Sequence, residues 1–226
     1  MKEKLAIPID FESITKDWLN LALQTSEMIN QTTIETFHIE TLDDGPGQTG
    51  QLARITLEYS HKSKEAPKSI IAKLSSKEPR VRAMMQKSRN YEKEVRFYLE
   101  LASKTNLSTP KCFYGDIDPE SGYCILLLED LAHYCVVDIS TGCNVYNAEL
   151  VIQSLANFHA NWWEKSEIQE IDYITPINQL AEYKQQQYQE WWLQFPQKLE
   201  TALPGYQLPP AFLELGQQFG AVLLNC

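Results

Sequence analysis

The feature that most constrains how this chain folds is a change in the spacing of its apolar residues near the middle of the sequence. Before Asp130, apolar and polar residues alternate over short segments, which is typical of half-buried strands. After Ala148, apolar residues recur three and four positions apart, which is typical of helices. Strands grouped first and helices grouped second predict an α+β fold with two lobes, and we place the boundary near Asp130.

The same patterns predict the individual elements. A helix at Thr15–Ser26, capped by Thr15, comes first, and a long helix is expected at Arg80–Lys104. Asp118–Gly122 is a strong turn signal between two strand-like segments and predicts a hairpin. The five expected strands are Ile34–Leu42, Gln51–Tyr59, Ser69–Ser75, Lys111–Asp116 and Tyr123–Glu129.

The chain is therefore expected to divide into two parts. Residues 1–130 would form a lobe with an antiparallel five-stranded sheet plus helix, and residues 131–226 a mainly helical lobe. Everything after Ile168 has a helical composition, interrupted by proline. The expected breaks are at Pro176, Pro196, Pro204 and Pro209–Pro210.

Composition and charge disfavour some classes of function. The 226 residues carry a formal net charge of -10, and an acidic surface disfavours nucleic acid and anionic membranes, which attract clustered Lys and Arg. The five cysteines form no C-x-x-C pair and are expected to be reduced structural thiols. The N-terminal residues lack the apolar core of a signal peptide, and no apolar run reaches the length of a membrane span. We therefore expect a cytoplasmic protein without nucleic-acid or membrane partners.

A glycine turn connects the first two expected strands. Gly45, Gly47 and Gly50 fit the spacing G-x-G-x-x-G, although no Gly-Lys-Ser/Thr follows as in a Walker loop. Glycines let the backbone approach a phosphate closely, and the N–H groups of a turn can receive its oxygens. An ordinary hairpin turn explains the same spacing, so this signal needs support from elsewhere in the chain.

That support comes from a lysine and a glutamate that follow. Lys73 lies inside an apolar strand, and an ammonium there must face solvent or a partner because burying it unpaired is costly. One interpretation is an outward-facing lysine, and the other is a lysine that binds phosphate. Glu94, on the next helix, can pair with Lys73; Glu92 is the rival, and we prefer Glu94 because it adjoins Val95.

The fourth feature is the apolar segment Ile125–Leu131, which ends in two acidic residues. The backbone groups at such a strand edge can bind an adenine, although an ordinary buried strand followed by a polar loop has the same pattern. The order of these four features matches the nucleotide-binding lobe of kinases. They are a glycine turn, a lysine on a strand, a glutamate on the next helix and an apolar strand at the hinge.

The residues around these features carry a resemblance to a known family. Tyr91–Tyr98, Pro110–Gly122, Leu126–Leu131 and Leu155–Trp163 resemble the ecdysteroid-kinase-like branch of the aminoglycoside-phosphotransferase superfamily. The resemblance is best between Gly45 and Trp163. It implies a protein-kinase-like bilobal fold that uses ATP and Mg²⁺ to phosphorylate a hydroxyl of a small molecule.

The resemblance also implies roles for particular residues. Lys73 would be the phosphate lysine and Glu94 its partner, and Gly45, Gly47 and Gly50 would cover the phosphates. The adenine-binding hinge would be flanked by Leu128, Glu129 and Leu131, which act largely through backbone groups. Nucleotide and a small-molecule acceptor are the partners that follow, and the acceptor is not identified by the sequence.

Phosphoryl transfer also needs a catalytic-loop aspartate and metal ligands, which this superfamily carries in a His-Gly-Asp stretch and a later Asp segment. None of the four histidines, His38, His61, His133 and His159, precedes Gly-Asp. We therefore assign no catalytic and no metal-binding residue, and we expect an N-terminal portion with a truncated C-lobe that is inactive alone. We also expect its aromatic C-lobe residues to be partly exposed, which favours self-association.

Two other interpretations stay open. The chain can be a pseudokinase-like nucleotide-binding or interaction module that performs no catalysis. It can also be an unrelated α+β protein in which the glycine turn and the lysine coincide by chance.

Overall fold

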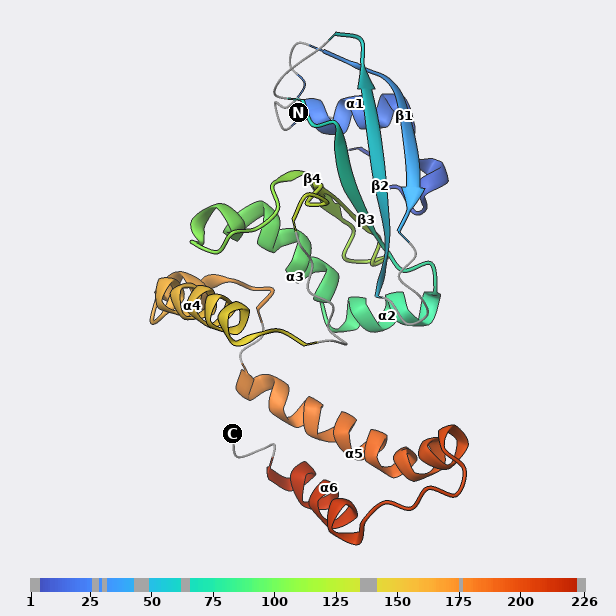
Figure 1. The fold of residues 1–226 in the computed structure, drawn as a ribbon, viewed down its shortest axis with the longest axis vertical. Helices are drawn as coiled ribbons and strands as arrows, with labels where there is room; N and C mark the ends of the chain where they lie inside the picture. The colour runs from blue at the N-terminus through green and yellow to red at the C-terminus, as the bar shows by residue number, and fades with distance from the viewer. Residues whose placement is uncertain are drawn as a thin grey trace. The chain divides into compact units, whose positions relative to one another are not determined.

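The computed structural model describes residues 5–25, 29, 32–42, 49–61, 66–134, 142–174 and 177–222. Its strands form one antiparallel sheet in the order β1-β2-β3-β5-β4 (Figure 1). The strands are β1 Ile34–Thr41, β2 Gly50–Tyr59, β3 Ser69–Ser75, β4 Cys112–Ile117 and β5 Cys124–Glu129. The predicted α+β fold with a five-stranded antiparallel sheet is confirmed.

Burial alternates along β3, because successive side chains of a strand point to opposite faces of the sheet. Ile70, Ala72 and Leu74 are buried on one face. This face is covered by α1 (Lys16–Thr25), which contacts β1 and β4 and lies beside β1 in Figure 1. The hydroxyl of Thr15 accepts the N–H of Trp18 at 3.1 Å, which confirms the predicted cap.

The opposite face carries Lys73 and is partly covered by a helical segment that follows β3. The elements are α2 Pro79–Lys87, α3 Asn90–Arg96, a π-helical turn at Phe97–Leu101 and a 3-10 turn at Ala102–Lys104. Tyr91 and Val95 of α3 are buried against Leu126 and Leu128 of β5. The prediction of one continuous helix over Arg80–Lys104 is therefore wrong. The chain breaks at Arg89, whose φ of 54° lies in the left-handed region.

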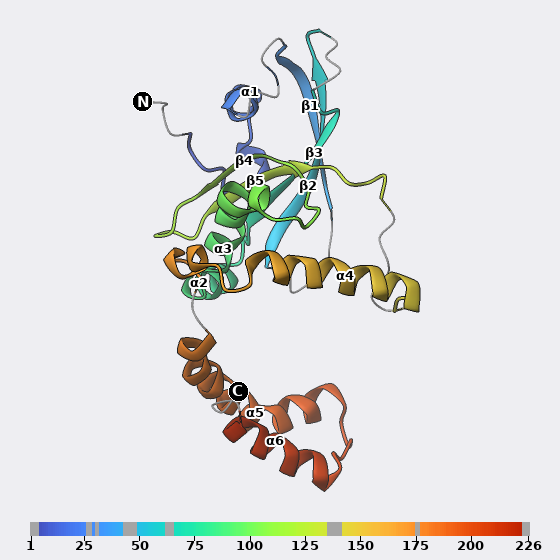
Figure 2. The ribbon, with the colours of Figure 1, turned by 90° about the vertical axis from the view of Figure 1, so that its left-hand side faces the viewer.

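The helical part of the chain begins with α4 (Val145–Trp162), whose first turn is capped by the Asn144 side chain. Two side-chain amides join its C-terminal end to the chain after α3: Asn106 donates to the Asn157 carbonyl and Asn161 to the Lys104 carbonyl. Figure 2 shows this end of α4 beside α3. A 3-10 turn at Ser166–Glu170 follows.

By their contacts the residues group into two units, Met1–Ile168 and Gln169–Cys226. The second unit is a helical hairpin of α5 (Ile177–Ala202) and α6 (Pro210–Val222). Its helices are joined by a hydrogen bond from the Tyr188 hydroxyl to the Gly216 carbonyl, 2.8 Å long.

The expected break at Pro196 is wrong, because α5 continues through this residue. The rings of Trp192 and Phe195, on the turn before the proline, lie within 6.5 Å of the Phe212 ring of α6. This packing offsets the lost backbone hydrogen bond. No helix within the described residues combines the length and the apolar character needed to cross a bilayer.

Candidate nucleotide site

The candidate site is built around Lys73, in the middle of the sheet. Lys73 lies opposite Leu52 of β2 and Leu126 of β5, and directly opposite residues of antiparallel strands share a face. Its Nζ donates to Oε1 of Glu94 at 2.5 Å. The side chains are 26% and 33% exposed, respectively, so the ion pair is half-buried and keeps some contact with solvent.

The position of Glu94 follows from the packing of α3. Its neighbour Val95 and, one turn earlier, Tyr91 are both buried in the cluster that contains Leu126. Anchoring these two side chains on the sheet turns Glu94 toward Lys73.

The rival carboxylate, Glu92, has other partners. It accepts two hydrogen bonds from the Arg89 guanidinium, at 2.7 and 2.8 Å, and one from Arg96 at 3.3 Å. The Arg89 hydrogen bond lowers the pKa of Glu92 and outweighs the opposing effect of burial. Glu92 thus stabilises the junction of α2 and α3, and the carboxylate that contacts Lys73 belongs to Glu94.

Of the three glycines in the predicted phosphate turn, Gly50 is described, and Gly45 and Gly47 lie outside the described residues. Gly50 opens β2 opposite Ser75. A methyl group on Gly50 would lie 2.7 Å from the Leu74 carbonyl oxygen and 3.7 Å from Cε of Lys73. Gly50 therefore lies close to Lys73, at a point where the backbones of β2 and β3 leave no room for a side chain.

The predicted hinge residues lie at the end of β5. Leu128 is buried opposite Ile71 of β3. The Glu129 N–H donates to the Lys111 carbonyl at 2.8 Å, so this N–H is engaged within the sheet. Leu131 follows the strand and accepts a hydrogen bond from the Tyr134 N–H through its carbonyl.

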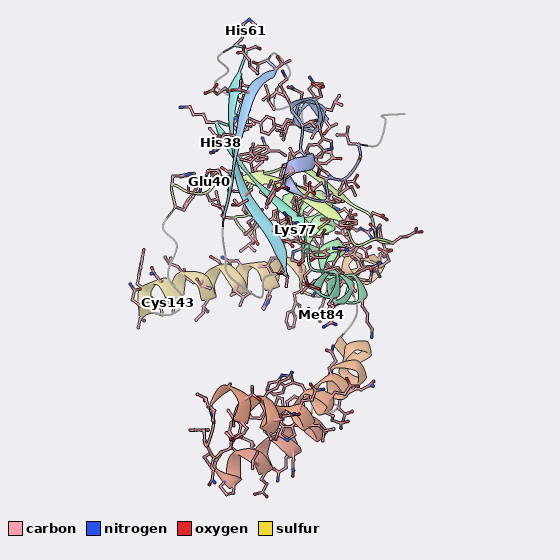
Figure 3. All side chains as sticks on the ribbon, turned by 90° about the vertical axis from the view of Figure 1, so that its right-hand side faces the viewer. His38, Glu40, His61, Lys77, Met84 and Cys143 are labelled. Carbon is pink, nitrogen blue, oxygen red and sulfur yellow. The ribbon has the colours of Figure 1, made fainter. Side chains whose placement is uncertain are left out.

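Sequence reasoning missed a polar cluster beside this hinge. One Asp130 carboxylate oxygen accepts hydrogen bonds from the Arg54 guanidinium and the Ser69 hydroxyl, both 2.8 Å long, and the other accepts the Ala132 N–H at 3.0 Å. Arg54 also lies 3.6 Å from Glu40, which is labelled in Figure 3. The cluster ties the chain after β5 to β2 and β3. Asp130 is 61 positions from Ser69 and 76 from Arg54 in the sequence, so no local pattern indicates the cluster.

Burial opposes the ionisation of Asp130, but the hydrogen bonds from Arg54, Ser69 and Ala132 prevail and lower the pKa of its carboxyl. The folded state thus binds the proton more weakly than the unfolded state, whose pKa is near 3.8. The stabilisation is present above this value and is lost as pH falls through the lowered pKa.

Substituting Asp130→Asn should lower the free energy of unfolding at pH 7 by about 1–2 kcal/mol. The difference between wild type and variant should shrink as pH falls below about 4. Urea unfolding at several pH values measures both effects. Glu100→Gln, at an exposed pair with Arg96, is the control and should change stability little. If the difference in free energy of unfolding between wild type and Asp130→Asn does not depend on pH, the lowered pKa of Asp130 does not stabilise the fold.

A cavity of about 260 Å³ lies elsewhere, between α2, α3 and the turn that joins β4 to β5. Its lining residues are Gln86, Arg89, Tyr91, Glu92, Ile117, Pro119 and Gly122. Lys73 does not line it, and the charges of Arg89 and Glu92 neutralise each other there. This cavity is therefore separate from the candidate site at Lys73.

The fold and the lysine-bearing face of the sheet define a class of protein. An antiparallel five-stranded sheet with a helix on its lysine-bearing face, followed by a helical part, is a kinase-like N-lobe arrangement. The sequence model of the Ecdysteroid kinase-like family (EcKL) matches residues 45–203, which is more than half of the chain. The chain belongs to this family, which indicates a kinase-like small-molecule phosphotransferase. No curated protein matches the sequence.

Proposed function

We propose that this chain contains the ATP-binding lobe of a phosphotransferase that acts on a hydroxyl of a small molecule. The observation that carries the proposal is the Lys73–Glu94 pair, which lies half-buried on a sheet face beside Gly50. A carboxylate that accepts a hydrogen bond from a lysine orients the lysine ammonium, which suits the binding of a phosphate oxygen. Residues 1–130 would be this lobe, and residues 131–226 part of a helical C-lobe.

The residues present fit a nucleotide. Lys73 would hold the phosphates, oriented by Glu94, with Gly45, Gly47 and Gly50 covering them. The base would be flanked by Leu128, Glu129 and Leu131. The Glu129 N–H is already hydrogen-bonded to the Lys111 carbonyl, so other backbone groups of this segment would bind the base. Bound ATP supplies the phosphoryl group for transfer. The part played by this chain is to place the phosphates on the lysine-bearing face and to keep them there.

We assign no Mg²⁺ ligand: among the described residues no three His, Cys, Asp or Glu side chains gather closely enough to hold a metal, and in nucleotide sites Mg²⁺ is held by one or two carboxylates together with phosphate oxygens. The sequence also contains no His-Gly-Asp stretch. We therefore propose that these 226 residues bind nucleotide but transfer no phosphate by themselves.

The cysteines Cys112, Cys124 and Cys143 are free thiols, which supports a cytoplasmic location.

Thermal unfolding with and without nucleotide tests the proposal. ATP should raise the unfolding temperature of the wild-type chain, and Lys73→Ala should weaken ATP binding about 10- to 100-fold, since hydrogen bonds to charged groups contribute about 1.5–3 kcal/mol. Lys68→Ala, an exposed lysine before β3, is the control. Unchanged ATP binding by Lys73→Ala would refute the site. ATP binding without phosphotransfer is the expected result and fits both this proposal and a pseudokinase-like nucleotide-binding module, whereas turnover near the ~1–100 s⁻¹ of kinases would refute inactivity.

We also propose that the chain self-associates through its helical part. Trp163, Trp191 and Phe219 expose between 47% and 73% of their surface, and exposed apolar groups favour association. Sedimentation should show a concentration-dependent increase in mass, and Trp191→Ser should reduce it. A monomer at all concentrations, with little binding of a hydrophobic dye, would contradict this expectation.

A further inference from the structure

The side chain of Tyr91, at the start of α3, joins two segments that flank the candidate site. Tyr91 is 2% exposed, and its hydroxyl makes two hydrogen bonds. The hydroxyl donates to the Thr49 carbonyl and accepts the Ser76 N–H at 3.0 Å. Thr49 is the last residue before β2, and Ser76 is the first residue after β3.

The register of the sheet explains why one hydroxyl reaches both segments. Gly50 lies opposite Ser75, so Thr49 and Ser76 form the next pair along the two strands. In an antiparallel ladder, a backbone N–H and a carbonyl of such a pair can bond directly. Here the Tyr91 hydroxyl lies between the Ser76 N–H and the Thr49 carbonyl, and it satisfies both groups.

Tyr91 and Glu94 are three positions apart on α3 and therefore lie on the same side of the helix. Glu94 holds the Lys73 ammonium, and Tyr91 holds the residue before Gly50. One face of α3 thus contacts both the lysine and the end of the glycine turn. A displacement of α3 would break both contacts together.

We propose that Tyr91 is a positioning residue, whose hydroxyl fixes the end of the glycine turn relative to the Lys73–Glu94 pair. This inference rests on the proposed function, since the turn and Lys73 matter together only if they hold the phosphates of one nucleotide. Burial raises the pKa of the Tyr91 hydroxyl, so at neutral pH the group keeps the proton that it donates to Thr49.

The variant Tyr91→Phe removes the hydroxyl and keeps the ring. Net contributions of about 0.5–1.5 kcal/mol for a hydrogen bond correspond to a Kd for ATP that is about 2- to 12-fold higher. The Kd for adenosine should change less, because adenosine has no phosphates for the turn to cover. The ratio of the two values, measured by calorimetry, separates positioning from a general loss of stability.

Tyr59→Phe is the matched control. Its hydroxyl donates to the Pro67 carbonyl at 2.7 Å, at the opposite end of β2. The loss of this bond should leave the ratio of the Kd for adenosine to that for ATP at the wild-type value. An equal change in both tyrosine variants would overturn the inference.

The remaining outcomes are distinct. If ATP binds and Lys73→Ala weakens it, but Tyr91→Phe keeps the wild-type ratio, the inference is wrong and the proposed function stands. If the wild-type chain binds no ATP, both are wrong. If Tyr91→Phe does not fold, hydrogen exchange of the wild-type chain decides: ATP should slow exchange at the Ser76 N–H more than adenosine does, and equal protection overturns the inference.

Discussion

Replacing Gly50 with valine should lower the free energy of unfolding by about 2–3 kcal/mol, because the new side chain has no room at the start of β2. Its Cβ would lie 2.7 Å from the Leu74 carbonyl oxygen. That oxygen is a backbone atom of β3, the central strand, so it cannot move without disturbing the pairing of β2 with β3. Urea unfolding followed by tryptophan fluorescence measures the loss.

Gly115 of β4 provides the control in the same sheet. A methyl group there would lie 3.1 Å from Cδ2 of Leu126 and 3.3 Å from Cδ2 of Leu99. Both contacts are with the ends of side chains and not with the backbone, and Leu99 is exposed enough to move. Gly115→Ala should therefore cost less than about 1 kcal/mol, and a loss as large as that of Gly50→Val would contradict the argument from the backbone contact.

The stability of Gly50→Val also bears on why glycine occupies this position. The sequence spacing suggested a role toward phosphate, and the structure gives an additional reason for glycine, the close approach of β3. The two reasons are compatible, because a Cβ added at Gly50 would also be in van der Waals contact with Lys73, 3.7 Å from its Cε.

The sheet was predictable because strand signals are local. Ser69–Ser75 is a short apolar segment, and Lys73 stands out there as a charged residue among apolar neighbours. The preference for Glu94 over Glu92 used the same kind of local argument, the position of Val95 on the helix.

The break in the predicted helix at Arg80–Lys104 was not predictable in this way. Neither glycine nor proline marks the junction, and an arginine adopts the left-handed conformation instead. Two hydrogen bonds from Arg89 to Glu92 compensate for that conformation. The bonds from Tyr91 to Thr49 and from Arg54 to Asp130 join residues 42 and 76 positions apart, and such contacts depend on the completed sheet.

Glu94→Gln should raise the Kd for ATP about 10-fold, whereas Glu92→Gln should change it less than about two-fold. Glutamine keeps the shape of Glu94 but removes the charge that orients the Lys73 ammonium. Glu92 serves Arg89 and Arg96, so its neutralisation should lower the stability of the α2–α3 junction instead. Calorimetry with ATP and thermal unfolding without it separate the two effects.

A double-mutant cycle makes the comparison decisive. If Glu94 acts through Lys73, then Glu94→Gln should have little further effect on ATP binding in a chain that already carries Lys73→Ala, because the shared interaction is gone. Glu92→Gln should give the same stability loss with or without Lys73. Additive effects of Lys73→Ala and Glu94→Gln on the Kd would mean that the observed 2.5 Å contact does not carry the function. A larger effect of Glu92→Gln than of Glu94→Gln would assign the role to the other carboxylate.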